Sequence, residues 1–143
     1  INIFYLISKN EKKFLIDFIT KVLKNKKMNE KKQKGKDYYW PRLNADKDGK
    51  INWDWDSKSI VLFIKAFSHP YNGAFSFIDN QKVRMFNAKF SSKKKFHPFQ
   101  NGIIFRENKK KIYIANQTGY LEILKEDLIY KKKIKSLIGK RLK

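Results

Sequence analysis

The chain has 143 residues, of which 41% are hydrophobic and 15% aromatic, so one domain with a substantial core is expected and disorder throughout is excluded. The absence of cysteine excludes disulfides, thiol catalysis and thiolate metal sites, and it fits a reducing cytoplasm. No apolar run is long enough to span a bilayer, and the apolar start Ile1–Ile7 lacks the basic region of a secretory signal. We therefore predict a cytoplasmic protein with no membrane partner. Because it begins with Ile, we also expect a fragment of a longer protein.

The formal net charge of +21 makes nucleic acid one candidate partner, because dense positive charge attracts polyphosphates. Arginine occurs only at Arg42, Arg84, Arg106 and Arg141, whereas base and bidentate phosphate recognition favour arginine over lysine. The lysine excess, with abundant Asn, Ile and Phe, also fits a bias toward A/T-rich codons. We favour this second interpretation, and loose attraction to an anionic partner stays open.

The N-terminal part is predicted to be an amphipathic helix followed by a basic connector. From Ser8 to about Lys27, apolar residues recur at helical spacing and define one face. They are Phe14, Leu15, Phe18, Ile19, Val22 and Leu23. Ser8 and Glu11 have the spacing of a capping box, in which two residues satisfy each other's backbone N–H groups. The stretch Asn25–Asp37 has no apolar periodicity and predicts a solvated connector.

A second, shorter helix and five short strands are predicted downstream. Asp56 or Ser57 would cap the helix, and Pro70 would end it. Its apolar stripe is Ile60, Val61, Ile64 and Phe67. The predicted strands are Ala74–Ile78, Val83–Phe90, Gly102–Arg106, Lys111–Ala115 and Tyr120–Leu124. The basic segment Lys125–Lys143 would add one strand or helix. The fold class is therefore α+β, with the strands in a small antiparallel barrel or sheet of OB-like type.

Residues 44–55 partly match a calcium-binding loop. Asp46, Asp48 and Gly49 occupy its third, fifth and sixth places. The twelfth place requires a bidentate Glu, and this chain has Trp55 there. We predict an Asp-Gly turn and no metal ligand.

The two histidines, His69 and His97, are each followed by proline. Two histidines cannot form a His-based catalytic zinc site by themselves, and general acid–base work also needs a positioned partner. We predict a helix-end role for His69 and a turn role for His97. Phosphate-cradling glycine loops and nucleophile elbows are also missing from the sequence. No catalytic, cofactor-binding or metal-binding residue is therefore assigned to this chain.

Aromatic residues cluster around the predicted Asp-Gly turn. They could stack a nucleobase or sugar, but large aromatic side chains also hold a linker against a neighbouring domain, and we favour this second role. If the segment is extended, Trp53 and Trp55 share one face. The predicted linker or domain contacts are Tyr39, Trp40, Arg42, Trp53, Trp55 and Tyr71.

Four short segments follow one another in a characteristic order. They are Tyr39-Trp40-Pro41-Arg42, Asp48-Gly49-Lys50-Ile51-Asn52-Trp53, Ile64-Lys65-Ala66 and Pro70-Tyr71-Asn72-Gly73-Ala74-Phe75. This order and spacing resembles the segment that joins the two halves of folate-dependent formyltransferases, the family of methionyl-tRNA formyltransferase and the sugar N-formyltransferases. The departures are Lys65 for the usual Arg and Asn72 for the usual second Pro. The resemblance covers Ser8 to Phe77 well and thins toward the C-terminus.

This resemblance implies that residues 1–37 are the terminal helix and connector of a preceding catalytic domain, and that residues 38–143 are the C-terminal domain. The family's catalytic half is Rossmann-like and uses 10-formyltetrahydrofolate. Its Asn, His and Asp catalytic residues lie upstream of this chain, so the missing N-terminal catalytic domain is an implied partner.

The segment Phe96–Arg106 looks more like the sugar-modifying branch of the family, so the expected acceptor is the amine of a nucleotide-linked aminosugar. A tRNA acceptor, as in methionyl-tRNA formyltransferase, is the alternative. Two other hypotheses stay open. One is a stand-alone basic OB-like module that binds single-stranded nucleic acid, and the other is an interaction module that forms a homodimer through its aromatic linker surface.

Overall fold

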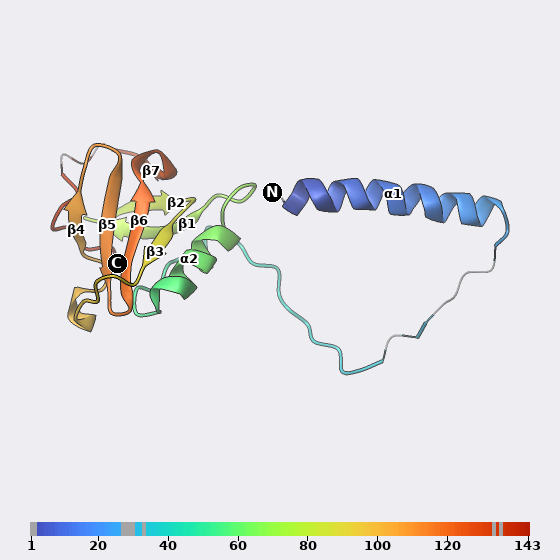
Figure 1. The fold of residues 1–143 in the computed structure, drawn as a ribbon, viewed down its shortest axis with the longest axis horizontal. Coiled ribbons are helices and arrows are strands. Elements are labelled where there is room, and N and C mark those ends of the chain that lie inside the picture. Colours follow the sequence, from blue (N-terminus) through green and yellow to red (C-terminus); the bar gives the residue numbers. More distant parts are fainter. Residues whose placement is uncertain (1–2, 27–30, 33, 133, 135) are drawn as a thin grey trace. The chain divides into compact units, whose positions relative to one another are not determined.

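The computed structural model describes all residues except 1–2, 27–30, 33, 133 and 135 (Figure 1). The chain divides into two compact units, Ile1–Trp40 and Pro41–Lys143. The first unit contains helix α1 (Ile3–Leu23), and the second contains helix α2 (Ser57–Ala66) and the strands. None of the helices in the described part of the chain combines the length and apolar character that a membrane span requires.

Helix α1 confirms the predicted N-terminal helix but begins earlier. Because it starts at Ile3, Ser8 lies inside the helix and the predicted capping box with Glu11 is wrong. Leu6 and Ile7 extend the apolar pattern toward the N-terminus, so the helix continues through Ser8 instead of starting there. The helix ends at Leu23, and the predicted end, Lys27, lies outside the described residues.

Helix α2 forms where the sequence predicts it. Asp56 is the N-cap, and its carboxylate accepts hydrogen bonds from the backbone N–H groups of Lys58 and Ser59, both at 3.0 Å. The hydroxyl of Ser59 also donates to this carboxylate and is the largest cause that lowers the pKa of Asp56, and the backbone hydrogen bonds lower it further. The predicted apolar stripe is buried.

The strands form two antiparallel sheets. One has the order β1-β2-β7, and the other has the order β3-β6-β5-β4. Their bounds are β1 Ala74–Ile78, β2 Gln81–Met85, β3 Lys89–Ser91, β4 Ile104–Glu107, β5 Lys111–Asn116, β6 Gly119–Leu124 and β7 Leu128–Tyr130. Two 3-10 helices, η1 (Pro98–Gln100) and η2 (Lys125–Asp127), connect them. The α+β class is confirmed, and the OB-like detail stays a prediction.

The predicted strand Val83–Phe90 is wrong as a single element. Its first part belongs to β2 and its last part to β3, and the two strands lie in different sheets. Between them, the N–H group of Phe86 donates to the carbonyl oxygen of Asp127, and the ring of Phe86 stacks on His69. The chain therefore crosses from one sheet to the other at this point.

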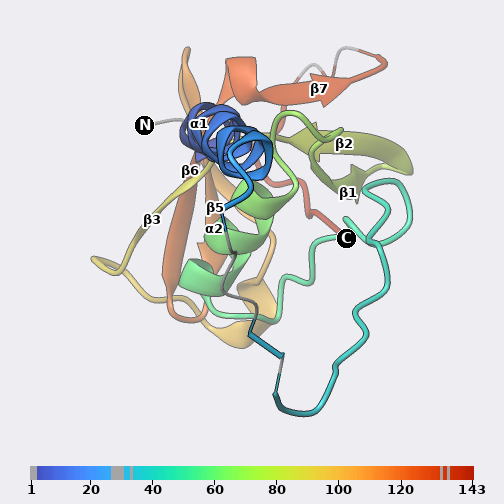
Figure 2. The ribbon, with the colours of Figure 1, turned by 90° about the vertical axis from the view of Figure 1, so that its right-hand side faces the viewer.

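The core of the second unit lies where α2 packs against strands of both sheets, namely β1, β3 and β6 (Figure 2). Ile60 and Ile64 of α2 and Leu121 of β6 are fully buried there. The C-terminal segment closes this core, because Leu137 and Leu142 are buried and the N–H group of Ile104 donates to the carbonyl oxygen of Lys140. The strand or helix predicted within Lys125–Lys143 is present as β7, and the described residues after β7 stabilise the unit without forming another strand or helix.

Glu107, on β4, fastens this C-terminal segment. One carboxylate oxygen lies 2.6 Å from the ammonium group of Lys125, and the other accepts hydrogen bonds from the N–H groups of Leu137 and Ile138 at 3.0 and 3.2 Å. The hydrogen bond from Lys125 is the main reason why the pKa of Glu107 lies below its ordinary value.

Glu107→Gln is therefore expected to reduce the acid sensitivity of the fold. Because folding lowers the pKa of Glu107, its carboxylate stabilises the protein above the unfolded pKa, and this stabilisation is lost as the pH falls through the folded pKa. Urea unfolding at about pH 7 and about pH 3, followed by tryptophan fluorescence, should show a smaller stability difference for the variant than for the wild type. Glu11→Gln, on α1, should keep the wild-type difference. Equal differences for Glu107→Gln and wild type would contradict the assignment.

Candidate functional site

The Asp-Gly turn at residues 44–50 is held by its own polar side chains. The carboxylate of Asp48 accepts a hydrogen bond from the N–H group of Asn44 at 2.7 Å, and the side chain of Asn44 accepts one from the N–H group of Asp46 at 2.8 Å. The carboxylate of Asp46 pairs with Arg84 on β2, which lowers the pKa of Asp46. A Cβ at Gly49 would lie 2.5 Å from the carbonyl oxygen of Ala45, so this close approach requires glycine. The described residues contain no group of three His, Asp or Glu side chains that could hold a metal ion.

A buried amide joins the segment after this turn to the second sheet. Asn116, at the end of β5, is 0% exposed. Its side-chain N–H₂ group donates to the carbonyl oxygens of Trp53 and Trp55 at 3.1 and 2.8 Å. Its side-chain oxygen accepts from the hydroxyl of Ser57 at 3.0 Å and from the N–H group of Thr118 at 3.1 Å. Three of these hydrogen bonds hold residues 53–57 against the β5–β6 hairpin, and the bond from Thr118 lies within the hairpin itself.

The residues predicted as linker or domain contacts separate into two groups. Trp53 is 6% exposed, and its indole N–H donates to the hydroxyl of Ser76 at 2.9 Å, so it belongs to the core of the second unit. The other five are exposed; they are Tyr39, Trp40, Arg42, Trp55 and Tyr71. Tyr39 and Trp40 are the most open of them, at 90% and 83%. The role of these five as domain contacts stays a prediction.

The expected common face of Trp53 and Trp55 does not form. Residues 53–55 make a turn instead of an extended segment, so the alternation that would place both rings on one side is lost. Trp53 points into the core, whereas the ring of Trp55 contacts Phe63 of α2 edge-on, with 5.2 Å between ring centroids.

Both histidines have local structural contacts. His97 is the N-cap of η1. Its imidazole Nδ1 accepts a hydrogen bond from the backbone N–H group of Phe99 at 3.2 Å, and the backbone N–H group of His97 donates to the side-chain oxygen of Gln100 at 3.1 Å. This agrees with the predicted turn role. His69 lies beyond the C-cap of α2, and its ring stacks on Phe86 with 4.6 Å between ring centroids.

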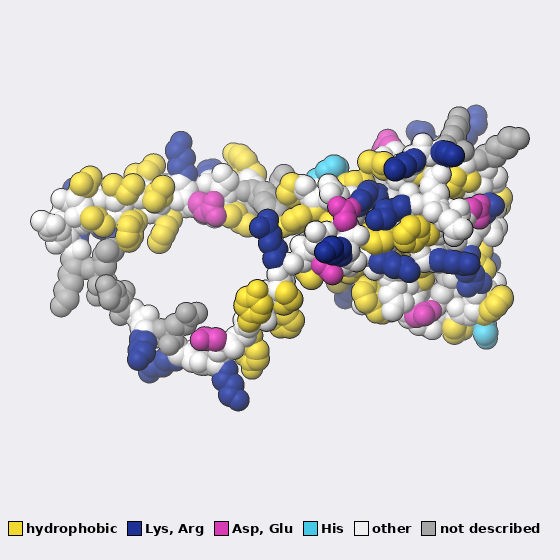
Figure 3. Space-filling model, turned by 180° about the vertical axis from the view of Figure 1, so that it is seen from behind, with side chains coloured by type: hydrophobic (Ala, Val, Ile, Leu, Met, Phe, Trp, Pro, Cys, Tyr) yellow, Lys and Arg dark blue, Asp and Glu magenta, His cyan; other side chains and the backbone are white. Residues whose placement is uncertain are grey.

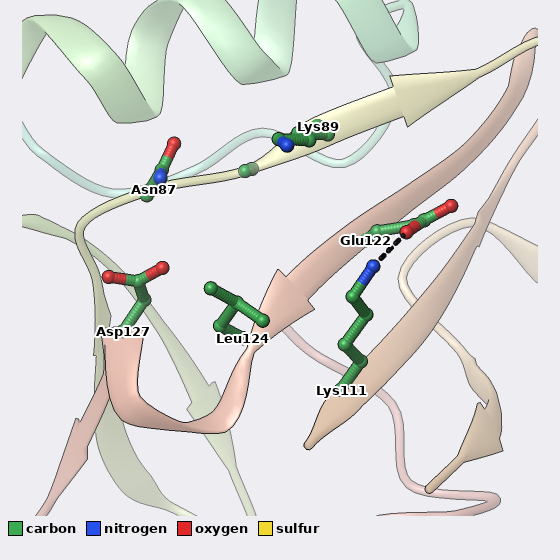
Figure 4. Close-up of a pocket in the computed structure, with 7 residues that line it drawn as sticks. Asn87, Lys89, Lys111, Glu122, Leu124 and Asp127 are labelled. Carbon is green, nitrogen blue, oxygen red and sulfur yellow. Dashed lines mark hydrogen bonds and ion pairs between the residues drawn. The ribbon is translucent and has the colours of Figure 1, made fainter.

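A small cavity beside β5 and β6 brings several charged groups together (Figure 4). The ammonium group of Lys111 lies 3.0 Å from the carboxylate of Glu122, and Asp127 lines the same space. Burial is the main cause that raises the pKa of Asp127. The volume is about 50 Å³, whereas ligand sites occupy roughly 300–1,000 Å³. This cavity can therefore hold water but not a substrate.

Sequence reasoning missed the role of Asn116. The usable signal was the tetrapeptide Asn116-Gln117-Thr118-Gly119 between two strand-like runs, since such a turn places an Asn side chain at a hairpin end. It gave no hint of the partners of Asn116, which lie about sixty residues earlier.

Asn116→Ala is expected to destabilise the second unit strongly, because it leaves buried carbonyl, hydroxyl and N–H groups without partners. We expect a loss of roughly 2–4 kcal/mol in the free energy of unfolding, measured by urea denaturation. Gln117→Ala is the matched control at the next position and should cost less than about 1 kcal/mol, because that side chain makes only an exposed hydrogen bond. Equal losses for the two variants would refute the role given to Asn116.

Trp53→Ala and Trp40→Ala test the division of the aromatic residues into a buried group and an exposed group. Trp53→Ala opens a cavity in the core and should cost roughly 3–5 kcal/mol of unfolding free energy. Trp40→Ala removes an exposed ring and should change stability by less than about 0.5 kcal/mol. Thermal or urea unfolding of the two variants provides the measurement. A large loss for Trp40→Ala would mean that this residue belongs to a packed core.

Comparison with known proteins supports the resemblance noted in the sequence. Residues 45–137 match the family model described as formyl transferase, C-terminal domain. Among solved structures, the chain is similar to a variant of HypX from Aquifex aeolicus, with a TM-score of 0.52 and 20% sequence identity. The match covers 76% of this chain and 19% of the HypX chain. Because only 20% of the aligned residues are identical, the match supports the fold alone. Because the family model spans more than half of the chain, this protein belongs to the formyl transferase C-terminal domain family.

Proposed function

We propose that this chain is the C-terminal, non-catalytic portion of a formyltransferase that transfers a formyl group from 10-formyltetrahydrofolate to the amine of a nucleotide-linked aminosugar. Family membership supports the assignment to formyl transfer. The family also implies a folate donor for the whole enzyme. The residues that hold the donor and perform the transfer would belong to the missing catalytic domain. The lack of cysteine fits the proposed cytoplasmic location.

The single observation that carries the non-catalytic role is the engagement of the titratable groups. His97 caps η1, His69 stacks on Phe86, and Glu107 fastens the C-terminal segment. A catalytic acid or base must be within reach of a substrate atom, whereas these side chains are directed at the protein's own backbone or rings. They therefore act in packing.

The exposed aromatic residues supply the proposed contact with the catalytic half. Tyr39 and Trp40 stand at the boundary between the two compact units, and both rings are open. Large aromatic side chains contribute much of the energy of buried contacts, so exposed rings beside a domain boundary suit a docking role. Arg42 and Tyr71, in the second unit, would add polar contacts of their own. A homodimer through the same surface is the alternative partner.

The acceptor is proposed from the segment 96–106. Its sequence is more like the sugar-modifying branch, and its proline and histidine form the capped start of η1 before β4. The lysine-rich composition is the observation that favours the rival, a methionyl-tRNA acceptor held by its phosphates.

The acceptor can be tested with the enzyme that contains this chain and its catalytic half. The donor would be 10-formyltetrahydrofolate, and the acceptors would be UDP-linked and dTDP-linked aminosugars and methionyl-tRNA. We expect formylation of an aminosugar and no comparable formylation of methionyl-tRNA. Preferred formylation of the tRNA would contradict the proposed acceptor but not the family.

The same enzyme tests the non-catalytic role. His97→Asn keeps a good N-cap residue, so kcat should stay within about threefold of the wild-type value. Loss of a general acid or base typically costs roughly 10²–10⁴-fold, and a loss of that size would place catalysis in this chain.

A further inference from the structure

The outer face of the β1-β2-β7 sheet carries a groove that the proposed function does not use. Its volume is about 700 Å³, which falls within the range of roughly 300–1,000 Å³ that is typical of ligand sites. Strand residues and the ends of the β1–β2 and β7 segments line it. Its lining includes Phe77, Lys82, Ile129, Lys131 and Lys132.

The two strands that flank β2 contribute apolar side chains to the groove. Phe77 on β1 is only partly buried, and its ring contacts Phe75 edge-on at 5.7 Å between ring centroids. On β7, Ile129 is 55% exposed and lies opposite Arg84 of β2 in the strand register. Phe77 and Ile129 lie on the same face of the sheet, on the two strands that flank β2, and both offer apolar surface to a planar ligand.

Lysine side chains lie between and beside these apolar residues. Lys82 lies directly opposite Phe77 in the register, and its ammonium group sits 4.0 Å from the centroid of Phe75. Lys131 and Lys132 are exposed and follow β7 directly, and the carbonyl oxygen of Lys132 accepts a hydrogen bond from Gln81 at 2.8 Å. That bond holds the two lysines beside the β1–β2 turn.

The positive charge of these lysines is not neutralised within the described residues. None of the four described ion pairs involves Lys82, Lys131 or Lys132. The carboxylate that lines the groove, Asp79, lies 2.6 Å from the ammonium group of Lys140, so its negative charge is already paired. Figure 3 shows hydrophobic side chains among many Lys and Arg and a few Asp and Glu side chains on one face of the second unit. A ligand that is planar at one end and multiply anionic at the other would complement such a groove.

We propose that this groove binds a nucleoside diphosphate, with the base on Phe77 and Ile129 and the phosphates at Lys82, Lys131 and Lys132. Stacking accepts any base because every base has a π-face, so the groove specifies the phosphates more than the base. The site lies on this chain itself and goes beyond the proposed function. The same chemistry is present in single-stranded RNA, so the experiment includes an RNA arm.

The test is isothermal titration of the full 143-residue chain at about 0.15 M salt with UDP, ADP, inorganic pyrophosphate and an oligouridine RNA. We expect UDP or ADP to bind at one site per chain and at least about tenfold more tightly than pyrophosphate, because only the nucleotide can stack. The variant Lys131→Ala/Lys132→Ala should weaken nucleotide binding at least about tenfold. The control Lys109→Ala/Lys110→Ala removes two exposed lysines from the β4–β5 turn and should leave the Kd within about twofold.

Three results would overturn the proposal: no saturable binding of either nucleotide, equal affinity for pyrophosphate, or equal weakening by the two double variants. Binding of the RNA without binding of either nucleotide would also overturn it and would assign the basic surface to RNA. Because the titration involves no formyl transfer, its failure would leave the proposed function untouched. Both pairs of lysines are exposed, and circular dichroism would confirm that the variants fold.

Discussion

The organisation of the second unit depends on one buried amide. Asn116 uses both its donors and its acceptor to join residues 53–57 to the β5–β6 hairpin. Those residues lead directly into α2, whose N-cap is Asp56, so the amide also fixes where this helix begins relative to the sheet. Helix α2 then packs its apolar stripe against both sheets and closes the core. A buried polar group without a partner costs more folding free energy than a paired one gains. The position of residues 53–57 can therefore vary little without destabilising the unit.

This constraint explains how the aromatic residues are divided. Trp53 is the first residue of the turn at residues 53–55 and is buried in the core, where its indole N–H group donates to the hydroxyl of Ser76. Trp55 follows two residues later and remains partly exposed beside Phe63. At the other end of the unit, Glu107 holds the C-terminal segment over the same core. The histidines and most of the carboxylates of the unit therefore make hydrogen bonds, ion pairs or ring contacts that stabilise its fold.

Local signals in the sequence were sufficient for several elements. The cap at Asp56 and the spacing of Ile60, Val61 and Ile64 predict α2 because both signals lie within one helix. The spacing of Ser8 and Glu11 wrongly predicted a helix start at Ser8, because the capping-box spacing also occurs inside helices. The apolar pattern extends back to Ile3, where α1 begins. The break between β2 and β3 was not predictable from Val83–Phe90, since it depends on a contact of Phe86 with Asp127, about forty residues later. The role of Asn116 and the grouping of Phe77 with Lys131 and Lys132 likewise depend on strand pairing across the fold.

The central claim is that this chain is a scaffold whose own residues do not perform formyl transfer. The most direct measurement incubates the purified chain with 10-formyltetrahydrofolate and aminosugar acceptors and follows the release of tetrahydrofolate. The account predicts release at the rate of a protein-free control, because His69, His97 and Glu107 are engaged in contacts within the protein. Saturable release that exceeds the control and scales with the concentration of the chain would contradict it.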